Sequence, residues 1–289
     1  MKNVLKFLLT VLVYCVFFIV MNMVLPFSRA FSDANANTDL SSMVFLFVSC
    51  FYNCLVICYL AVNSNWRGIK RSLGIIFSVF MIAAFMTQLE TYFFGDAFPI
   101  LTKTDILFIT LAMLPSIIAA TWMSVIFFGN KEYALRSEPV PLSPLITRIV
   151  SLGLIYAAIY FLFGYFVAWQ VEELRLFYSG STEDAGFFGQ LINNLSGNPI
   201  IYPFQFVRGI LFVSFLLPVF FMLRDSRIKF LLACCLVQLT TAVVLLIPNV
   251  LFPDAVRWAH FYEMASSMLL FGMLTGVILY IPVKRDRFL

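Results

Sequence analysis

The chain has 289 residues, of which 62% are hydrophobic and only 12% are charged. A soluble domain of this length cannot bury so much apolar surface, so a soluble globular protein is excluded. The formal net charge of +4 comes with no basic, aromatic-interleaved face outside the apolar segments, which also excludes a nucleic-acid-binding module.

Eight apolar segments follow one another along the chain, each close to the length of about 20 residues that a membrane-spanning helix needs. We therefore expect an all-α, polytopic integral membrane protein that lies in the lipid bilayer. The first apolar segment is longer than the roughly 7–15 apolar residues of a secretory signal, so it is predicted to be a retained helix. The expected spans cover residues 4–25, 42–62, 72–94, 106–129, 149–170, 201–223, 230–251 and 259–282.

The basic residues predict how these spans are oriented. Fourteen of the nineteen Lys and Arg residues lie before or in the first turn of the first span, in the even-numbered connections or after the last span. Segments rich in Lys and Arg remain on the cytoplasmic side of a membrane. The sequence therefore predicts cytoplasmic N- and C-termini. It contains no eukaryotic sorting motif, so a bacterial inner membrane is the simplest location.

The spans divide into two sets of four. Residues 1–130 would form the first half and residues 149–289 the second, joined by a proline-containing cytoplasmic linker at 131–148. Short matches that flank the third and seventh spans are compatible with a parallel internal repeat or with chance similarity of positively charged flanks. The division into two halves is predicted in either case.

The longest connection on the predicted outer side covers residues 171–200. Within it, residues 184–195 have the pattern of an amphipathic helix that lies on the membrane surface. Two interpretations remain open for this helix: a lid over an outward-facing pocket, or a connector at the membrane interface.

Ionisable and amide side chains occur inside the outer halves of the third, sixth and eighth spans. A charged residue at the centre of a spanning helix costs about 2.5–3.5 kcal/mol on insertion scales, so such groups should face one another or water. We expect Arg208 to bridge Glu90 and Glu263, because a guanidinium can bind two carboxylates while it stays charged. The predicted substrate- or proton-binding residues are Glu90, Gln205, Arg208, Arg257, His260 and Glu263.

Three functional interpretations fit this cluster. As a binding site, it would serve a permease-like or sensing protein for a small solute or a proton, with Arg257 and His260 at the mouth; this is our functional prediction. As a structural ion pair, it would hold helices together in a non-catalytic scaffold or complex subunit. In an intramembrane enzyme, Glu90 or Glu263 would be a general base with His260 as its partner. A homo-oligomer or a partner subunit is compatible with all three.

Known intramembrane enzymes give little support to the catalytic interpretation. The pair Glu172-Glu173 followed by Arg175 resembles the paired-glutamate motif of CAAX-processing proteases, but that family has its arginine four residues after the second glutamate, not two. That family also needs further histidines, whereas His260 is the only histidine of the chain. A single histidine likewise excludes bis-histidine haem and histidine-rich zinc sites. We predict no cofactor, no metal ion and no catalytic residue.

Overall fold

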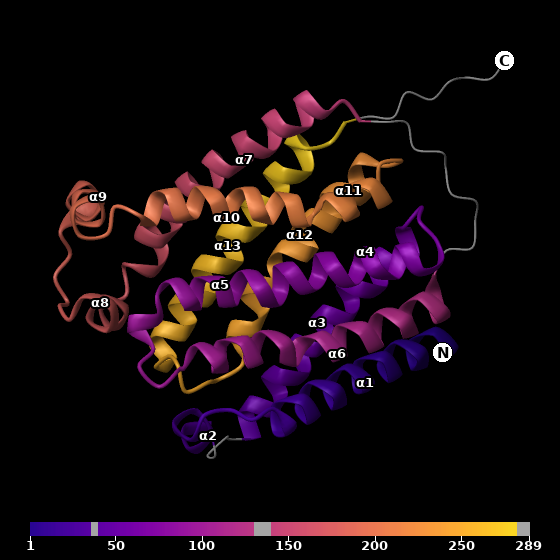
Figure 1. Cartoon of the computed structure of the whole chain (residues 1–289), viewed down its shortest axis with the longest axis horizontal. Helices are drawn as coiled ribbons and strands as arrows, with labels where there is room; N and C mark the ends of the chain where they lie inside the picture. Colours follow the sequence, from indigo (N-terminus) through magenta and orange to yellow (C-terminus); the bar gives the residue numbers. More distant parts are fainter. Residues whose placement is uncertain (36–39, 130–139, 282–289) are drawn as a thin grey trace.

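The structure, a computed structural model, describes residues 1–35, 40–129 and 140–281. These residues form helices and connecting segments, with no strand among them. Eight of the helices are long and apolar enough to cross a membrane. The predicted all-α polytopic membrane fold is therefore confirmed, and Figure 1 shows its long helices running side by side in an inclined bundle.

The spans follow the expected order, and three of them change helix type along their length. They are α1 (Lys2–Val24), α3 (Leu40–Asn63), α4–η1–α5 (Gly68–Phe80, Met81–Phe85 and Met86–Phe93), α6 (Lys103–Phe128), α7–η3 (Leu142–Phe163 and Gly164–Ala168), α10–α11 (Ile201–Phe215 and Leu217–Met222), α12–η4 (Arg227–Val243 and Val244–Leu246) and α13 (Asp254–Ile278). The shorter helices are α2 (Arg29–Asn35), η2 (Gly95–Ala97), α8 (Glu172–Ser179) and α9 (Gly186–Gly197).

The fifth span begins earlier than the sequence indicated. Helix α7 starts at Leu142, so the last part of the segment expected as a linker is helical. Pro144 is compatible with this start because a proline in the first turn removes no helical hydrogen bond. Residues 131–139 of the expected linker lie outside the described residues. The division of the chain into two halves stays a prediction.

Glycines allow several of the helices to approach closely. A Cβ atom at Gly209 of α10 would lie 2.9 Å from the Cα atom of Gly153 in α7, and one at Gly276 of α13 would lie 2.7 Å from the Cα atom of Leu231 in α12. Gly272, one turn before Gly276, faces the α12 backbone in the same way. Small residues at such contacts bring helix backbones together and increase van der Waals packing in membranes.

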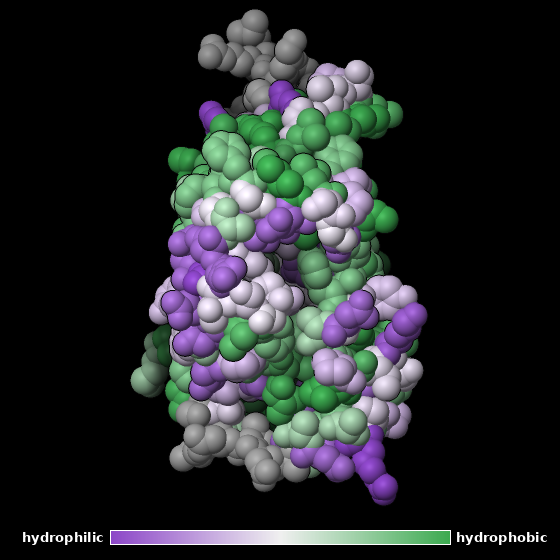
Figure 2. Space-filling model, turned by 90° about the vertical axis from the view of Figure 1, so that its left-hand side faces the viewer, coloured by the Kyte–Doolittle hydropathy of each residue, from purple (hydrophilic) through white to green (hydrophobic). Residues whose placement is uncertain are grey.

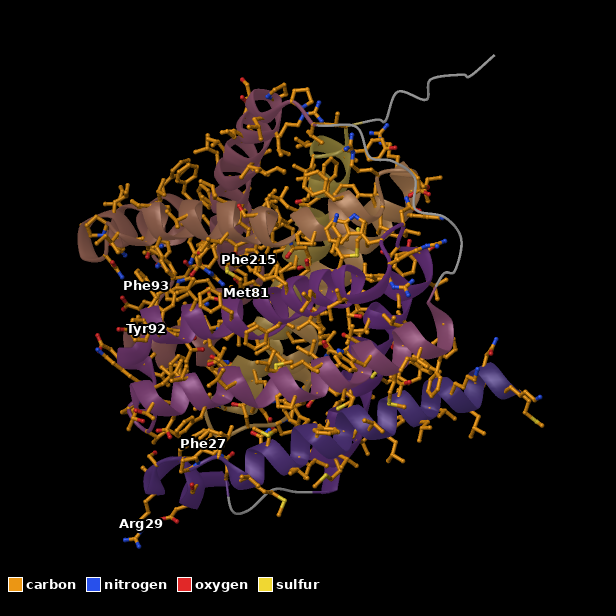
Figure 3. The ribbon with its side chains drawn as sticks, turned by 45° about the vertical axis from the view of Figure 1, so that its right-hand side comes forward. Phe27, Arg29, Met81, Tyr92, Phe93 and Phe215 are labelled. Carbon is orange, nitrogen blue, oxygen red and sulfur yellow. The ribbon has the colours of Figure 1, made fainter. Side chains whose placement is uncertain are left out.

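Helices from the two predicted halves pack into a common core. The Tyr52 hydroxyl of α3 donates to the Leu236 carbonyl of α12 at 2.9 Å. The Tyr59 hydroxyl, further along α3, donates to the Lys229 carbonyl at 3.0 Å. In Figure 3, Met81 of η1 and Phe215 of α10 lie near each other where the third and sixth spans meet. The relation of the halves by an internal repeat stays a prediction.

One end of the bundle carries α8 and α9, opposite the end at which the N-terminus lies (Figure 1). We call it the α8–α9 end. Helix α9 confirms the helix expected at 184–195, and the apolar side chains of Phe188, Ile192 and Leu195 on it are exposed. Helices α2 and α8 were not predicted, because each is too short to produce a clear periodic pattern.

Candidate functional site

A cavity of about 1250 Å³ opens at the α8–α9 end. Figure 2 looks onto this end and shows a hollow near its centre, with hydrophilic side chains beside it. Residues of the third, fifth and eighth spans line the cavity together with α2, α8 and α9. Its volume exceeds the range of about 300–1,000 Å³ that is common for small-molecule pockets, so it can accept a solute of substantial size.

One π-helical segment lines this cavity, and another directly precedes a helix that lines it. Segment η1 immediately precedes α5, whose residues Thr87 and Glu90 line the cavity. Segment η3 itself contributes Gly164 and Ala168 to the lining. A π-helical turn rotates the residues that follow it relative to a regular α-helix, and such turns occur often at functional sites.

The strongest polar contact near the cavity is the ion pair of Arg208 and Glu90. The two terminal nitrogens of Arg208 donate to the two carboxylate oxygens of Glu90, at 2.7 and 2.8 Å. Arg208 also donates to the Gln205 side-chain oxygen at 2.7 Å and to the Met86 carbonyl at 3.4 Å. This two-point contact is the geometry in which a guanidinium and a carboxylate bind most strongly.

The two partners of this ion pair have different surroundings. The Arg208 side chain is 1% exposed and that of Glu90 is 25% exposed. Three aromatic rings surround the guanidinium, with their centroids 5.6–5.8 Å from its central carbon, those of Tyr156, Phe204 and Phe212. Arg208 therefore lies behind the cavity wall and holds Glu90, which is part of that wall.

A second polar group consists of Glu263, His260 and Tyr178. The Nδ1 atom of His260 lies 3.0 Å from the Oε2 atom of Glu263, and its Nε2 atom lies 3.0 Å from the Tyr178 hydroxyl. A carboxylate can only accept a hydrogen bond, so an ionised Glu263 places a proton on Nδ1. In neutral His260, Nε2 then accepts from Tyr178. All three side chains line the cavity.

Tyr178 is suited to be the donor in this row. Burial, together with the negative charges of Glu90 and Glu263, raises the pKa of Tyr178 above its ordinary value. The phenol therefore stays protonated at neutral pH and can donate to His260. Because Tyr178 belongs to α8, the same hydrogen bond ties the connecting segment to α13.

The structure separates the residues that we expected to form one cluster. Arg208 contacts Glu90 but forms no ion pair with Glu263 in the described part of the chain, because Glu263 is bound to His260 instead. The expected bridge is therefore wrong. Gln205 supports Arg208 from within α10 and is fully buried.

Arg257 lies apart from the cavity lining. Its guanidinium donates to the carbonyls of Leu245 and Leu246, at 3.1 and 3.0 Å, and to the Asp254 carboxylate at 2.8 Å. These contacts connect the first turn of α13 to the end of the seventh span. The expected position of Arg257 at the mouth is not what the structure shows, since Arg257 is buried and does not line the cavity.

The sequence did not single out Tyr178 or Asp184 for this site. The carboxylate of Asp184 accepts from the Tyr165 hydroxyl at 3.2 Å and from the Gly186 backbone N–H at 2.9 Å, at the edge of the cavity. Both residues lie in a connecting segment, where polar residues are ordinary. The only sequence signal was the acidic and aromatic composition of that segment.

The pair Glu172-Glu173 begins α8 and is exposed, and the nearby Arg175 donates to the carbonyls of Thr182 and Trp169, each at 2.7 Å. These contacts hold the connecting segment together. Within the described residues, no group of three or more His, Cys, Asp or Glu side chains has an arrangement that could hold a metal ion.

In comparisons with known proteins, no family model, no curated protein and no solved structure matches this chain.

Proposed function

We propose that this multi-pass membrane protein binds a small solute in the cavity at the α8–α9 end, in a permease-like or sensing role. The observation that carries the proposal is the polar wall of this cavity. Glu263, whose side chain is 9% exposed, is held in the wall by His260 and not by an arginine or lysine. A residue kept only for helix–helix cohesion would be expected to have a full counter-charge, as Arg208 has.

The ion pair of Arg208 and Glu90 then supports the binding wall. It fixes the carboxylate of Glu90 at the cavity surface through two hydrogen bonds, while the guanidinium stays behind it. A preorganised polar group of this kind can orient a ligand without the cost of ordering a free side chain. The alternative role as a scaffold would leave the cavity without a ligand.

A proton is the second candidate ligand. The row Tyr178–His260–Glu263 joins three side chains of the cavity wall by two hydrogen bonds of 3.0 Å and ends at a carboxylate of a spanning helix. Ionisable residues inside membrane helices often mark ion or proton pathways. In this role, Glu263 would accept the proton and His260 would transfer it.

We further propose a bacterial inner membrane, with both termini in the cytoplasm and the cavity open to the outside. The basic residues Arg67, which caps α4, and Arg148, near the start of α7, lie at helix ends that are opposite α8 and α9, as the positive-inside rule requires for this orientation. This orientation makes the cavity an uptake or sensing site for extracytoplasmic solutes.

A cavity-filling substitution tests the proposal. Gly164 lines the cavity, and a Cβ atom there would make an ordinary contact of 3.6 Å with Glu263. Gly164→Phe would therefore place a ring in the cavity with little effect on the backbone. In a thermal-shift screen of solutes in detergent, we expect ligands that raise the Tm of the wild type by several degrees and leave Gly164→Phe unchanged.

Gly95→Phe is the matched control, because nothing lies within 4 Å of a Cβ atom at Gly95 and the residue does not line the cavity. It should respond to the same ligands as the wild type. If every stabilising solute acts equally on the wild type and on Gly164→Phe, the cavity is not a binding site and the scaffold role is favoured.

A further inference from the structure

The charged lining of the cavity is acidic. Four carboxylates line it, those of Glu90, Glu183, Asp184 and Glu263, whereas no Lys or Arg side chain does so in the described part of the chain. Arg208 neutralises Glu90 from behind, and no arginine or lysine among the described residues is in ion-pair contact with the other three carboxylates. The potential inside the cavity is therefore negative, and a cavity of low dielectric focuses such a potential on its interior.

Aromatic residues make up half of the apolar lining. Among them are Phe31, Phe94, Tyr160, Phe161, Trp169 and Phe252. The faces of such rings carry negative charge density and attract cations, by about 0.5–1 kcal/mol at exposed sites and about 2 kcal/mol or more where water is excluded. The aromatic rings and the carboxylates therefore both favour a positively charged ligand.

Glu263 is the anionic group best placed for such a ligand. Its Oε2 atom faces the Nδ1 atom of His260, and no hydrogen bond from the described residues involves its Oε1 atom. The Oε1 atom points towards Gly164, which has no side chain to cover it. A ligand cation that enters beside Gly164 can therefore reach a carboxylate oxygen that the protein leaves without a hydrogen bond.

From this lining we infer that the solute is an organic cation with an aromatic or aliphatic body, held by Glu263 through its charge and by the aromatic rings through its body. The inference rests on the proposed function, because it names the ligand class of the same cavity. Anionic solutes are disfavoured, since among the described residues no Lys or Arg side chain lines the cavity to meet them. Amide side chains near α9, among them Gln190 and Asn194, can bind polar substituents of such a ligand.

Three probes of similar aromatic bulk test the charge preference: tetraphenylphosphonium, tetraphenylborate and triphenylphosphine oxide. Their binding would be measured with the full-length protein in nanodiscs. Subtracting the signal of Gly164→Phe from that of the wild type removes the contribution of partition into lipid. We expect tetraphenylphosphonium to bind the wild type at least tenfold more tightly than the other two probes. Glu263→Gln should weaken the binding of this cation at least tenfold and leave the binding of triphenylphosphine oxide unchanged.

Two further variants keep the test decisive if Glu263→Gln does not fold. Glu183→Gln removes an exposed carboxylate at the edge of the cavity and should weaken the cation by about twofold to threefold through the loss of one charge. Glu173→Gln removes an exposed carboxylate of α8 that does not line the cavity, and it should leave binding unchanged.

The outcomes separate the two proposals. Preferred binding of the neutral or the anionic probe, lost in Gly164→Phe, would overturn the cation inference and retain the solute-binding function. Equal binding of all probes to wild type and Gly164→Phe would overturn both. An equal effect of Glu173→Gln and Glu183→Gln on the cation would show a general surface-charge effect and would also overturn the inference.

Discussion

Arg208 and Glu90 form one ion pair but respond differently to the loss of their partner. Arg208 is enclosed by protein, so without Glu90 it would be a buried charge with only Gln205 and the Met86 carbonyl as acceptors. Glu90 faces the cavity, where water can reach it. Removal of a single partner from a buried pair costs more than removal of both, since the remaining charge has no compensation.

A double-mutant cycle measures this asymmetry. Glu90→Gln should lower the free energy of unfolding by about 3–5 kcal/mol, because it leaves the guanidinium of Arg208 uncompensated. The double variant Glu90→Gln/Arg208→Met should recover most of that loss, since methionine fills the space without a charge. Unfolding in detergent of the wild type, both single variants and the double variant gives the coupling energy. Purely additive effects would show that the pair contributes nothing as a unit.

The sequence could indicate which residues are unusual but not how they pair. Glu90, Arg208 and Glu263 were evident as charges within apolar segments. Their contacts depend on how each helix is rotated about its axis, which charge spacing along one helix does not determine. The pairing of Arg257 with Asp254 is easier to predict from the sequence, because Asp254 precedes Arg257 by three residues and lies on the same helical face.

At the scale of the elements, the apolar pattern predicted each span but none of the π-helical segments. Residues in η1 and η3 are as apolar as their α-helical neighbours, so no change of pattern marks them. The switch to π-helix shifts the positions of α5 and of the lining residues Gly164 and Ala168. Helical faces that are assigned from the sequence with a regular α-helical period are therefore displaced in two of the segments that line the cavity.

The contact between α12 and α13 gives a prediction in which two effects have opposite signs. In an open helix, Gly→Ala stabilises by about 0.8–1.0 kcal/mol through helix propensity. At Gly276, the added Cβ atom would lie 2.7 Å from the Cα atom of Leu231, so the helices must separate. We expect Gly276→Ala to destabilise by about 1–3 kcal/mol, as overpacking does.

Thermal or chemical unfolding in detergent checks this prediction against Gly95→Ala. Nothing surrounds a Cβ atom at Gly95, so its unfolding free energy should change by less than that of Gly276→Ala. A stabilised Gly276→Ala would show that the two helices can adjust their distance at no cost.

At the scale of the whole molecule, the cavity lies at the end of the bundle with few basic residues. Carboxylates of α8 and of the α8–α9 connection, together with Asp96 and Asp254, are found there, whereas Lys6 near the start of α1 and Lys229 near the start of α12 lie towards the other end. The same charge distribution that predicts orientation thus makes the cavity acidic. Orientation and ligand charge are therefore linked properties of this fold.

Cysteine labelling tests the orientation. Ser196 at the end of α9 and Ser143 at the start of α7 are exposed and lie towards opposite ends of the bundle. In intact bacterial cells, a membrane-impermeant maleimide should label Ser196→Cys, whereas Ser143→Cys should be labelled only after the membrane is permeabilised. The six native cysteines lie within the spans, so the wild type serves as the background control.

Each pattern of labelling has a distinct structural meaning. The reverse pattern would place the cavity in the cytoplasm, and labelling of both positions in intact cells would contradict the eight-span topology. If only Ser196→Cys is labelled, the negative cavity faces the outer side of the membrane, which is electrically positive relative to the cytoplasm. A cation bound there would then be drawn inward by about 2.3 kcal/mol per 100 mV for each charge. The orientation therefore decides whether the proposed ligand would move with or against the electrical driving force.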